Sequence, residues 1–327
     1  VTTSQATVST PGTLRVAANT QPGQTLVNQA GKLSANLLDL QVSNLANTHG
    51  GEIVQTGTGG TTIALSGAID NSGATLASNG SLALTAASLD NRGGTLRAAQ
   101  ASDLSVNVTG LLDNSQGEIS ASGNTTVRAG SLANDAGRVT AAGDVASTTG
   151  GATRNRGGTI AANGSTALNA ASLDNSGGTV SGLNRLAITV QGAVDNTAGT
   201  LATNQALTLG AGSLANDKGS IQSTQAATQV NVSGALDNGQ GYIGAATDLG
   251  LQAGSLSNGA GGSLRGAHDT TLAVTGLLAN DGSLTAGRNT TITTGSLQGG
   301  STGVLGAGIQ SDGQLGTAGE LSVTASG

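Results

Sequence analysis

The sequence predicts an all-β fold, a parallel β-helix (solenoid) of about 14 coils in which each coil contributes three short strands. A short motif, clearest as LDNRGGTL from Leu89 to Leu96, returns every 19 to 24 residues from Leu26 onward. Between its copies, apolar and polar residues alternate, which is typical of strands with one buried face. A repeat of this length indicates stacked units that share one continuous core.

The composition restricts what that core can contain. The 327 residues include no Trp, Phe, Met or Cys, and Tyr242 is the single aromatic residue. Aromatic side chains normally supply much of a globular core, so the core of this chain must be thin and aliphatic. The 55 glycines could suggest disorder, but 36% hydrophobic residues in a regular period favour an ordered chain.

An asparagine anchors each repeat. These anchors are Asn28, Asn47, Asn71, Asn91, Asn114, Asn134, Asn155, Asn175, Asn196, Asn216, Asn238, Asn258 and Asn280. An aliphatic residue precedes each anchor by two positions, except at Thr153, and glycine follows by three positions in eleven repeats. We expect a turn at this glycine, because glycine adopts a positive φ at low steric cost.

The three strands of a coil follow from the positions around the anchor. One strand begins after the turn, as at Leu96 with the small Ala98 two residues later, and a second alternating run follows, as at Leu104, Val106 and Val108. The third strand is the aliphatic-x-Asn segment itself. The density of Gly, Thr, Ser and Asn disfavours helix throughout.

The anchor spacings define two kinds of coil. From Asn47 onward, coils of 20 residues alternate with coils of 21 to 24 residues. The shorter kind ends with Ser-Leu before its anchor, and this rule predicts the next anchor position at Gly299. We therefore divide the chain into an incomplete or irregular coil at 1–22, a β-helix repeat domain at 23–300, and irregular final coils at 301–327 that continue into a longer protein.

Charge and apolar runs argue against several functional classes. The net charge of −6 comes from 12 basic and 18 acidic residues scattered singly, so no basic stripe is available for nucleic acid. There is no run of about 18 apolar residues and no basic region followed by an apolar block at the start. We expect no nucleic-acid partner, and the sequence shows neither a membrane span nor a signal peptide.

The asparagine column is the main candidate site. A row of amides could bind a repeating ligand, but stacked amides more commonly hydrogen bond to each other and to turn backbone groups. We predict such a structural ladder and no cofactor, metal or catalytic residue. The predicted ladder comprises Asn71, Asn91, Asn114, Asn134, Asn155, Asn175, Asn196, Asn216, Asn238, Asn258 and Asn280.

Aspartates beside the anchors, such as Asp90 before Asn91, could instead form a calcium-binding edge. We expect turn residues, because the nine-residue glycine- and aspartate-rich calcium repeat is absent. Parallel β-helices also occur in polysaccharide-cleaving enzymes, but those need carboxylates gathered at one place, and here the charges are spread thinly.

Five further residues are weaker candidates for a site. His49 and His268 lie in glycine-rich bends far apart in the sequence, and we expect both to be solvated. Arg154 and Arg156 flank the anchor of the one repeat that lacks the aliphatic residue, which indicates a weak coil more than a site. Tyr242 occupies a position held elsewhere by polar residues, so it should point outward.

The repeat Leu-Asp-Asn-x-x-Gly-x-Leu-x-Ala, followed by a Leu-x-Leu or Val-x-Val strand, resembles the haemagglutinin repeats of filamentous haemagglutinin and related exoproteins. The resemblance spans about residues 24–300. It implies a right-handed parallel β-helix that forms the shaft of a secreted or outer-membrane surface protein of a Gram-negative bacterium.

The same resemblance implies partners and an alternative function. An outer-membrane transporter would act during two-partner secretion, and host or neighbouring cells would be contacted through regions outside this segment. The repeats are also similar to the stick of contact-dependent growth inhibition toxins. The sequence therefore predicts a non-catalytic adhesin shaft, with a toxin stalk as the alternative and a carbohydrate-active enzyme as a distant third.

Overall fold

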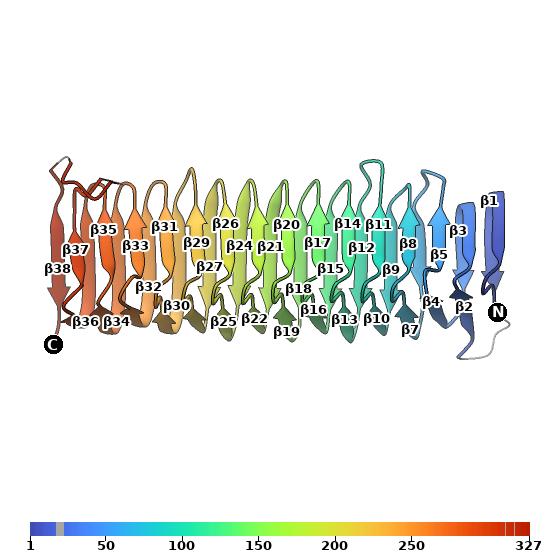
Figure 1. The fold of residues 1–327 in the computed structure, drawn as a ribbon, viewed down its shortest axis with the longest axis horizontal. Coiled ribbons are helices and arrows are strands. Elements are labelled where there is room, and N and C mark those ends of the chain that lie inside the picture. Colours follow the sequence, from blue (N-terminus) through green and yellow to red (C-terminus); the bar gives the residue numbers. More distant parts are fainter. Residues whose placement is uncertain (18–22, 311, 317) are drawn as a thin grey trace. The chain divides into compact units, whose positions relative to one another are not determined.

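The computed structural model describes residues 1–17, 23–310, 312–316 and 318–327, and every regular element in them is a β-strand. The chain divides into two units, Val1–Gly164 and Ser165–Gly327. Within each unit, strands from successive coils lie side by side in parallel (Figure 1). The prediction of an all-β parallel β-helix of about 14 coils is confirmed.

In the first unit, β1 and the strands that follow each asparagine turn form one sheet, here called the first sheet. They are β1 (Thr7–Ala17), β3 (Lys32–Gln41), β5 (Glu52–Gln55), β8 (Thr75–Ser78), β11 (Thr95–Ala98), β14 (Glu118–Ala121), β17 (Arg138–Ala141) and β20 (Thr159–Ala162).

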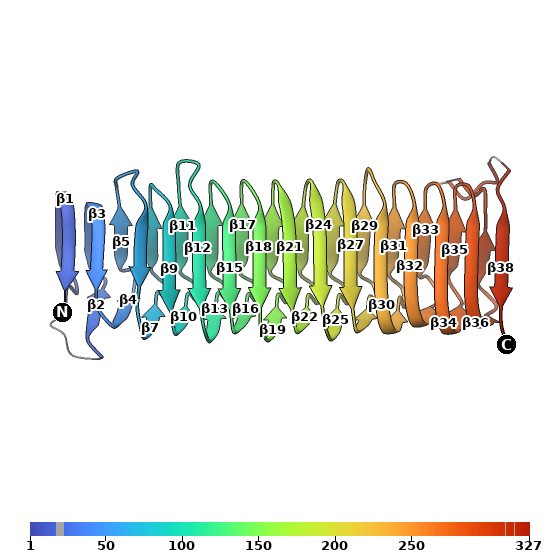
Figure 2. The same cartoon turned by 180° about the vertical axis from the view of Figure 1, so that it is seen from behind.

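The second sheet of this unit contains two rows of strands, visible from behind in Figure 2. Its long row is β6 (Thr61–Ala64), β9 (Leu82–Ala86), β12 (Leu104–Val108), β15 (Thr125–Ala129) and β18 (Val145–Thr149). Its anchor row is β2 (Thr25–Gln29), β4 (Asn44–Thr48), β7 (Ala68–Asp70), β10 (Ser88–Asp90), β13 (Leu111–Asp113), β16 (Ser131–Ala133) and β19 (Ala152–Arg154).

The second unit repeats this plan. Its first sheet contains β23 (Thr179–Gly182), β26 (Thr200–Thr203), β29 (Ser220–Ser223), β31 (Tyr242–Ala245), β33 (Ser263–Gly266), β35 (Ser283–Ala286) and β37 (Val304–Gly306). Its long row begins with β21 (Ser165–Ala170), β24 (Arg185–Val190) and β27 (Ala206–Ala211), and its anchor row with β22 (Ser172–Asp174), β25 (Ala193–Asp195) and β28 (Ser213–Ala215).

Later coils of the second unit differ from the three-strand expectation. There the long and anchor strands are continuous, as β30 (Thr228–Asp237), β32 (Leu249–Asn258), β34 (Thr270–Asn280) and β36 (Thr290–Gly299), and β38 (Leu321–Ala325) pairs with β36. The bend is still present as a register shift, for example between Val232 and Ala235. A bulge turns the strand without ending its hydrogen-bond ladder.

Equivalent side chains stack in columns because the strands pair in register. Leu76, Leu96, Ile119, Val139 and Ile160 are successive partners in the first sheet, and all are fully buried. Each inward column is therefore continuous from coil to coil. This stacking gives each coil most of its apolar contacts, because a single coil is too thin to bury its own face.

The ends of the chain also contain paired strands. Residues 7–17, within the segment expected to be an incomplete or irregular coil, form β1, which pairs with β3 with one irregularity between Thr10 and Thr13. Residues 18–22 of that segment lie outside the described residues. Near the other end, Gly299 is in register with Asn280, at the position that the spacing rule predicts.

The expected positive φ at the glycine three residues after an anchor is present at Gly50 and Gly261, but most of these positions require glycine for another reason. In the turn after Asn114, the positive φ belongs to Gln116, two residues after the anchor. A Cβ on Gly117 would lie 2.1 Å from the Asn91 carbonyl oxygen and 2.8 Å from the Asn114 Oδ1. Glycine is therefore required here by the close approach of the ladder itself.

Candidate functional site

The anchor asparagines meet in a column at the turn between the anchor row and the first sheet. In the first unit, each Nδ2 donates to the Oδ1 of the next anchor at 2.7–2.8 Å, from Asn28 through Asn47, Asn71, Asn91, Asn114 and Asn134 to Asn155. In the second unit, the same bonds of 2.7–2.9 Å run from Asn175 through Asn196, Asn216, Asn238 and Asn258 to Asn280.

Each amide also satisfies backbone groups. The Asn91 Nδ2 lies 3.2 Å from the carbonyl oxygen of Gly94 in its own turn and 3.1 Å from that of Glu118 in the next coil. The anchor side chains are fully buried, apart from 2% exposure at Asn280. Because their donors already have acceptors and solvent does not reach them, these amides have little capacity to bind a ligand.

The aspartates that precede anchors stabilise the same turn from outside. Each Oδ1 accepts a hydrogen bond from the backbone N–H two residues later, at 2.9–3.2 Å. These residues are Asp70, Asp90, Asp113, Asp174, Asp195 and Asp237. This is the Asx-turn arrangement, in which a short polar side chain replaces a backbone acceptor.

Asp90 also has a charged partner. The Arg92 Nη2 lies 2.6 Å from its Oδ2, and the Arg92 Nε lies 3.9 Å from the Asp113 Oδ2. Burial acts to raise the pKa of Asp90, but the hydrogen bonds and charge of Arg92 outweigh it and hold that pKa below its ordinary value. The carboxylate is therefore kept ionised by the turn.

A second recurring hydrogen bond was not predicted from the sequence. Buried threonines at the start of long-row strands donate from Oγ1 to a backbone carbonyl oxygen of the first sheet in the following coil, at 2.6–2.9 Å. The donors are Thr125, Thr166, Thr228, Thr270 and Thr290. The available signal was threonine in a column elsewhere occupied mostly by leucine, since Thr125 pairs with Leu104 and Thr228 with Leu207.

The remaining candidate residues are not brought together into a site. His49 and His268 lie in different units, and the His49 Nδ1 is 3.0 Å from the Thr48 Oγ1. Arg154 forms an ion pair with Asp135 at 3.4 Å, and the Arg156 backbone N–H donates to the same aspartate at 3.2 Å. Each of these contacts is local to a bend.

Tyr242 faces outward, as expected, but its ring is half-buried. A Cβ on Gly244 would lie 2.0 Å from the Tyr242 hydroxyl oxygen, so the ring lies across this glycine on the outer surface of β31. Burial raises the pKa of Tyr242, and the nearby charge of Arg265 partly opposes the rise. Glycine thus provides the space for the single aromatic side chain.

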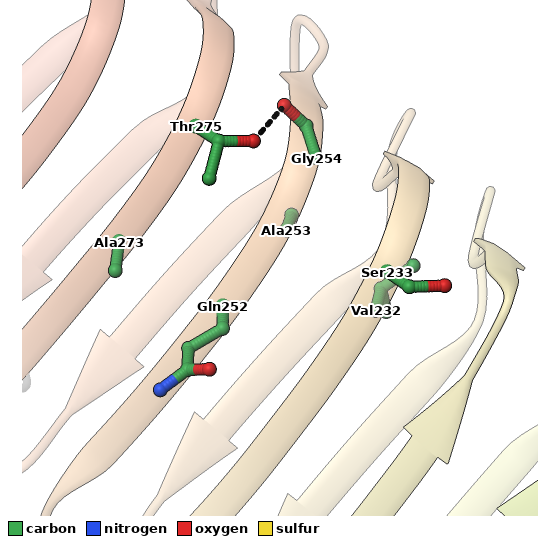
Figure 3. A pocket seen from close by; sticks show the side chains of 7 residues that line it. All are labelled: Val232, Ser233, Gln252, Ala253, Gly254, Ala273 and Thr275. Atoms are coloured by element: carbon green, nitrogen blue, oxygen red, sulfur yellow. Dashed lines mark hydrogen bonds between the residues drawn. The ribbon is translucent and has the colours of Figure 1, made fainter.

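The outer surface of the second unit has a shallow hollow at the bend of β30, β32 and β34. Val232, Ser233, Gln252, Ala253, Gly254, Ala273 and Thr275 line it (Figure 3). The Thr275 hydroxyl donates to the Gly254 carbonyl oxygen at 3.2 Å. No lining residue is ionisable, so the hollow has no group for acid–base catalysis near neutral pH.

Among the residues that the structure describes, no group of three or more His, Cys, Asp or Glu side chains is placed to hold a metal ion. The same part of the chain contains no helix with the length and apolar character needed to cross a membrane.

Together, the in-register coils and the buried amide column define a structural repeat protein of the parallel β-solenoid class. A family model described as the haemagglutinin repeat matches residues 10–73, 58–116, 101–157, 121–198, 187–240 and 229–327. The chain belongs to the haemagglutinin repeat family. Comparison with curated proteins and comparison with solved structures each returned no match.

Proposed function

We propose that this chain is a segment of the shaft of a large secreted or surface-exposed bacterial exoprotein of the adhesin type. In this role it is non-catalytic and holds a distal functional region away from the cell. The observation that carries the proposal is the match of haemagglutinin repeats along residues 10–327. The family is a structural one, which fits a role in spacing rather than in chemistry.

The asparagine column supports this role. Successive coils use the same buried amide contacts, so the stabilising contacts recur along each unit and are not concentrated at one place. Such quasi-one-dimensional stability suits a part whose purpose is length. We propose that the ladder asparagines act structurally and bind no ligand or cofactor.

We also propose a location and a secretion partner. The haemagglutinin repeat family is associated with two-partner secretion, and its members are typically secreted or surface proteins of bacteria. On this basis the parent protein is exported through an outer-membrane transporter of a Gram-negative bacterium. Contacts with host or neighbouring cells are then made by regions outside this segment.

Two alternatives lead to different observations. If the chain is the stalk of a contact-dependent growth inhibition toxin, a nuclease-like or other toxic domain is encoded downstream of Gly327. If it is a carbohydrate-active enzyme, the purified chain cleaves a polysaccharide. We rank the enzyme last, because the carboxylates that line another hollow, Asp70, Asp90 and Asp113, already accept hydrogen bonds in their own turns.

Cell binding by the purified chain tests the shaft proposal. Beads coated with residues 1–327 should adhere to epithelial and bacterial cells no better than beads coated with an unrelated protein of similar charge. Saturable binding that soluble chain competes away would show that this segment is itself an adhesive region, and would reject the proposal of a passive shaft.

A further inference from the structure

One coil of the first unit has a polar interior. Ser147 follows Val106 and Val127 in one inward column, and Thr153 follows Leu112 and Leu132 in another. Thr149 lies beside Ala129 in a third column. We call residues 145–155 the polar coil, and residues 104–114, whose inward side chains are aliphatic, the aliphatic coil.

The hydroxyls of the polar coil are buried but unequally paired. The Thr149 Oγ1 lies 3.0 Å from the Thr153 Oγ1 and 3.1 Å from the Gly151 carbonyl oxygen. Ser147 is 1% exposed, and its Oγ is the one buried side-chain polar atom without a hydrogen-bond partner among the described residues. A buried hydroxyl in this state has lost its hydration without replacement.

The polar coil does not compensate with extra space. Ser147, Thr149 and Thr153 have together the same number of side-chain heavy atoms as Val127, Ala129 and Leu132 in the preceding coil. The exchange therefore changes polarity at nearly constant volume. A buried water needs a space of its own as well as polar partners, and this exchange creates no such space.

We propose that the polar coil is the seam at which the first unit opens first. Closing this coil buries hydroxyls where the aliphatic coil buries methyl groups, so its closed state is less favoured than that of its neighbours. If the proposed shaft function is correct, the shaft unfolds locally at this coil before it does so elsewhere in the first unit. The opening itself does not depend on that function.

Native-state hydrogen exchange measured by mass spectrometry tests the seam in the whole chain. After correction for intrinsic rates, amides of β18 and β19 should exchange at least about tenfold faster than those of β12 and β13. Equal or slower exchange in the polar coil would overturn the proposal, whether or not the chain later proves to be a shaft.

A volume-matched variant isolates the side chains from the position of the coil. The triple variant S147V/T149A/T153L gives the polar coil the interior of the preceding coil and should slow its exchange by roughly 5- to 150-fold, the equivalent of one unpaired buried polar group. Exchange in β12 and β13 should not change. Unchanged exchange in β18 would show that the hydroxyls do not cause the opening.

The reverse variant V127S/A129T/L132T provides the control. It should speed exchange in β15 and β16 and so move or widen the seam. If this variant fails to fold, the stabilised S147V/T149A/T153L variant still decides the question by itself.

Discussion

The aliphatic coil and the polar coil follow the same backbone path but differ in the side chains that fill their interiors. In the aliphatic coil, Leu104, Val106, Val108 and Leu112 are all at most 2% exposed. In the polar coil, Val145 is followed by three buried hydroxyls. Both coils keep the parallel register and a ladder asparagine, Asn114 in one and Asn155 in the other.

This difference shows which features hold a coil in shape. Backbone pairing and the amide column persist where apolar burial is reduced, so the path of the chain does not require an aliphatic interior in every coil. Burying a Val or Leu side chain contributes about 1.5 to 3 kcal/mol, and the polar coil forgoes part of that contribution. Its neighbours supply the missing stability, as expected of a solenoid with nearest-neighbour coupling.

The largest effect should come from the feature that the two coils share. Asn114→Asp should destabilise the first unit by about 3 to 5 kcal/mol at neutral pH, the usual range when a buried charge lacks a partner. The new carboxylate cannot donate to Asn134 Oδ1 or to the carbonyl oxygens of Gly117 and Arg138. Chemical denaturation followed by far-UV circular dichroism would measure the loss.

Asn155→Asp is the matched substitution in the polar coil. Asn155 accepts from Asn134 and donates to the Gly158 carbonyl oxygen, as Asn114 accepts from Asn91 and donates to that of Gly117. The cost of Asn155→Asp should therefore equal that of Asn114→Asp within about 1 kcal/mol. A much smaller cost at Asn155 would mean that the ladder, and not only the interior, is weaker in the polar coil.

The next largest loss of stability should come from a substitution that makes the aliphatic interior polar. Leu112→Thr places at Leu112 the residue that the polar coil has in the same column, and it should cost about 2 to 4 kcal/mol through lost burial and a new buried hydroxyl. Leu111→Thr serves as the control, because Leu111 is 46% exposed and should change stability by less than about 0.5 kcal/mol. Similar losses in both variants would contradict the assignment of inward and outward positions.

Paired and unpaired hydroxyls should respond with opposite signs. Thr125→Val removes the hydrogen bond of 2.7 Å from Oγ1 to the Thr140 carbonyl oxygen and should cost about 1 kcal/mol. Ser147→Ala removes a hydroxyl that has no partner and should be neutral or stabilise by up to about 1 kcal/mol. Thermal unfolding of the two variants checks the sign, and a clear loss at Ser147→Ala would show that its hydroxyl has a partner in solution.

The smallest effect should come from the surface turns outside either interior. Because its folded pKa is lowered, Asp90 contributes stability that is present above its unfolded pKa of about 3.9 and is lost as pH falls through the folded value. Asp90→Asn should therefore reduce stability by less than about 1 kcal/mol at pH 7. The difference from the unchanged protein should vanish as pH falls below the lowered folded pKa of Asp90.

Stability measured as a function of pH would check this effect. Arg92→Gln removes the side-chain hydrogen bonds and the charge that lower the pKa of Asp90, but keeps the backbone N–H. It should therefore reduce the pH dependence that Asp90 contributes. An unchanged pH dependence in Arg92→Gln would show that the arginine side chain is not its cause.

Much of this architecture could be predicted from the sequence, because each repeat is specified by patterns of residues that are close in sequence. The alternation around Leu96 and Ala98 predicts a strand that buries those side chains, and both are fully buried. The anchor spacing also locates the turns, including the one in which Gly299 aligns with Asn280. These features depend on residues close in sequence and on a period that repeats them.

Only the tertiary structure decided which polar groups meet. The acceptor for Thr125 is 15 residues away, and the ladder acceptor for the Asn91 amide, the Asn114 Oδ1, is 23 residues away, so each of these pairs depends on the path of a whole coil. The same holds for Gly117, which is required by the Asn91 carbonyl oxygen of the preceding coil and not by its own φ. Sequence periodicity shows that a side chain points inward, but whether a buried hydroxyl finds a partner, as Thr149 does and Ser147 does not, is set by the packing of successive coils.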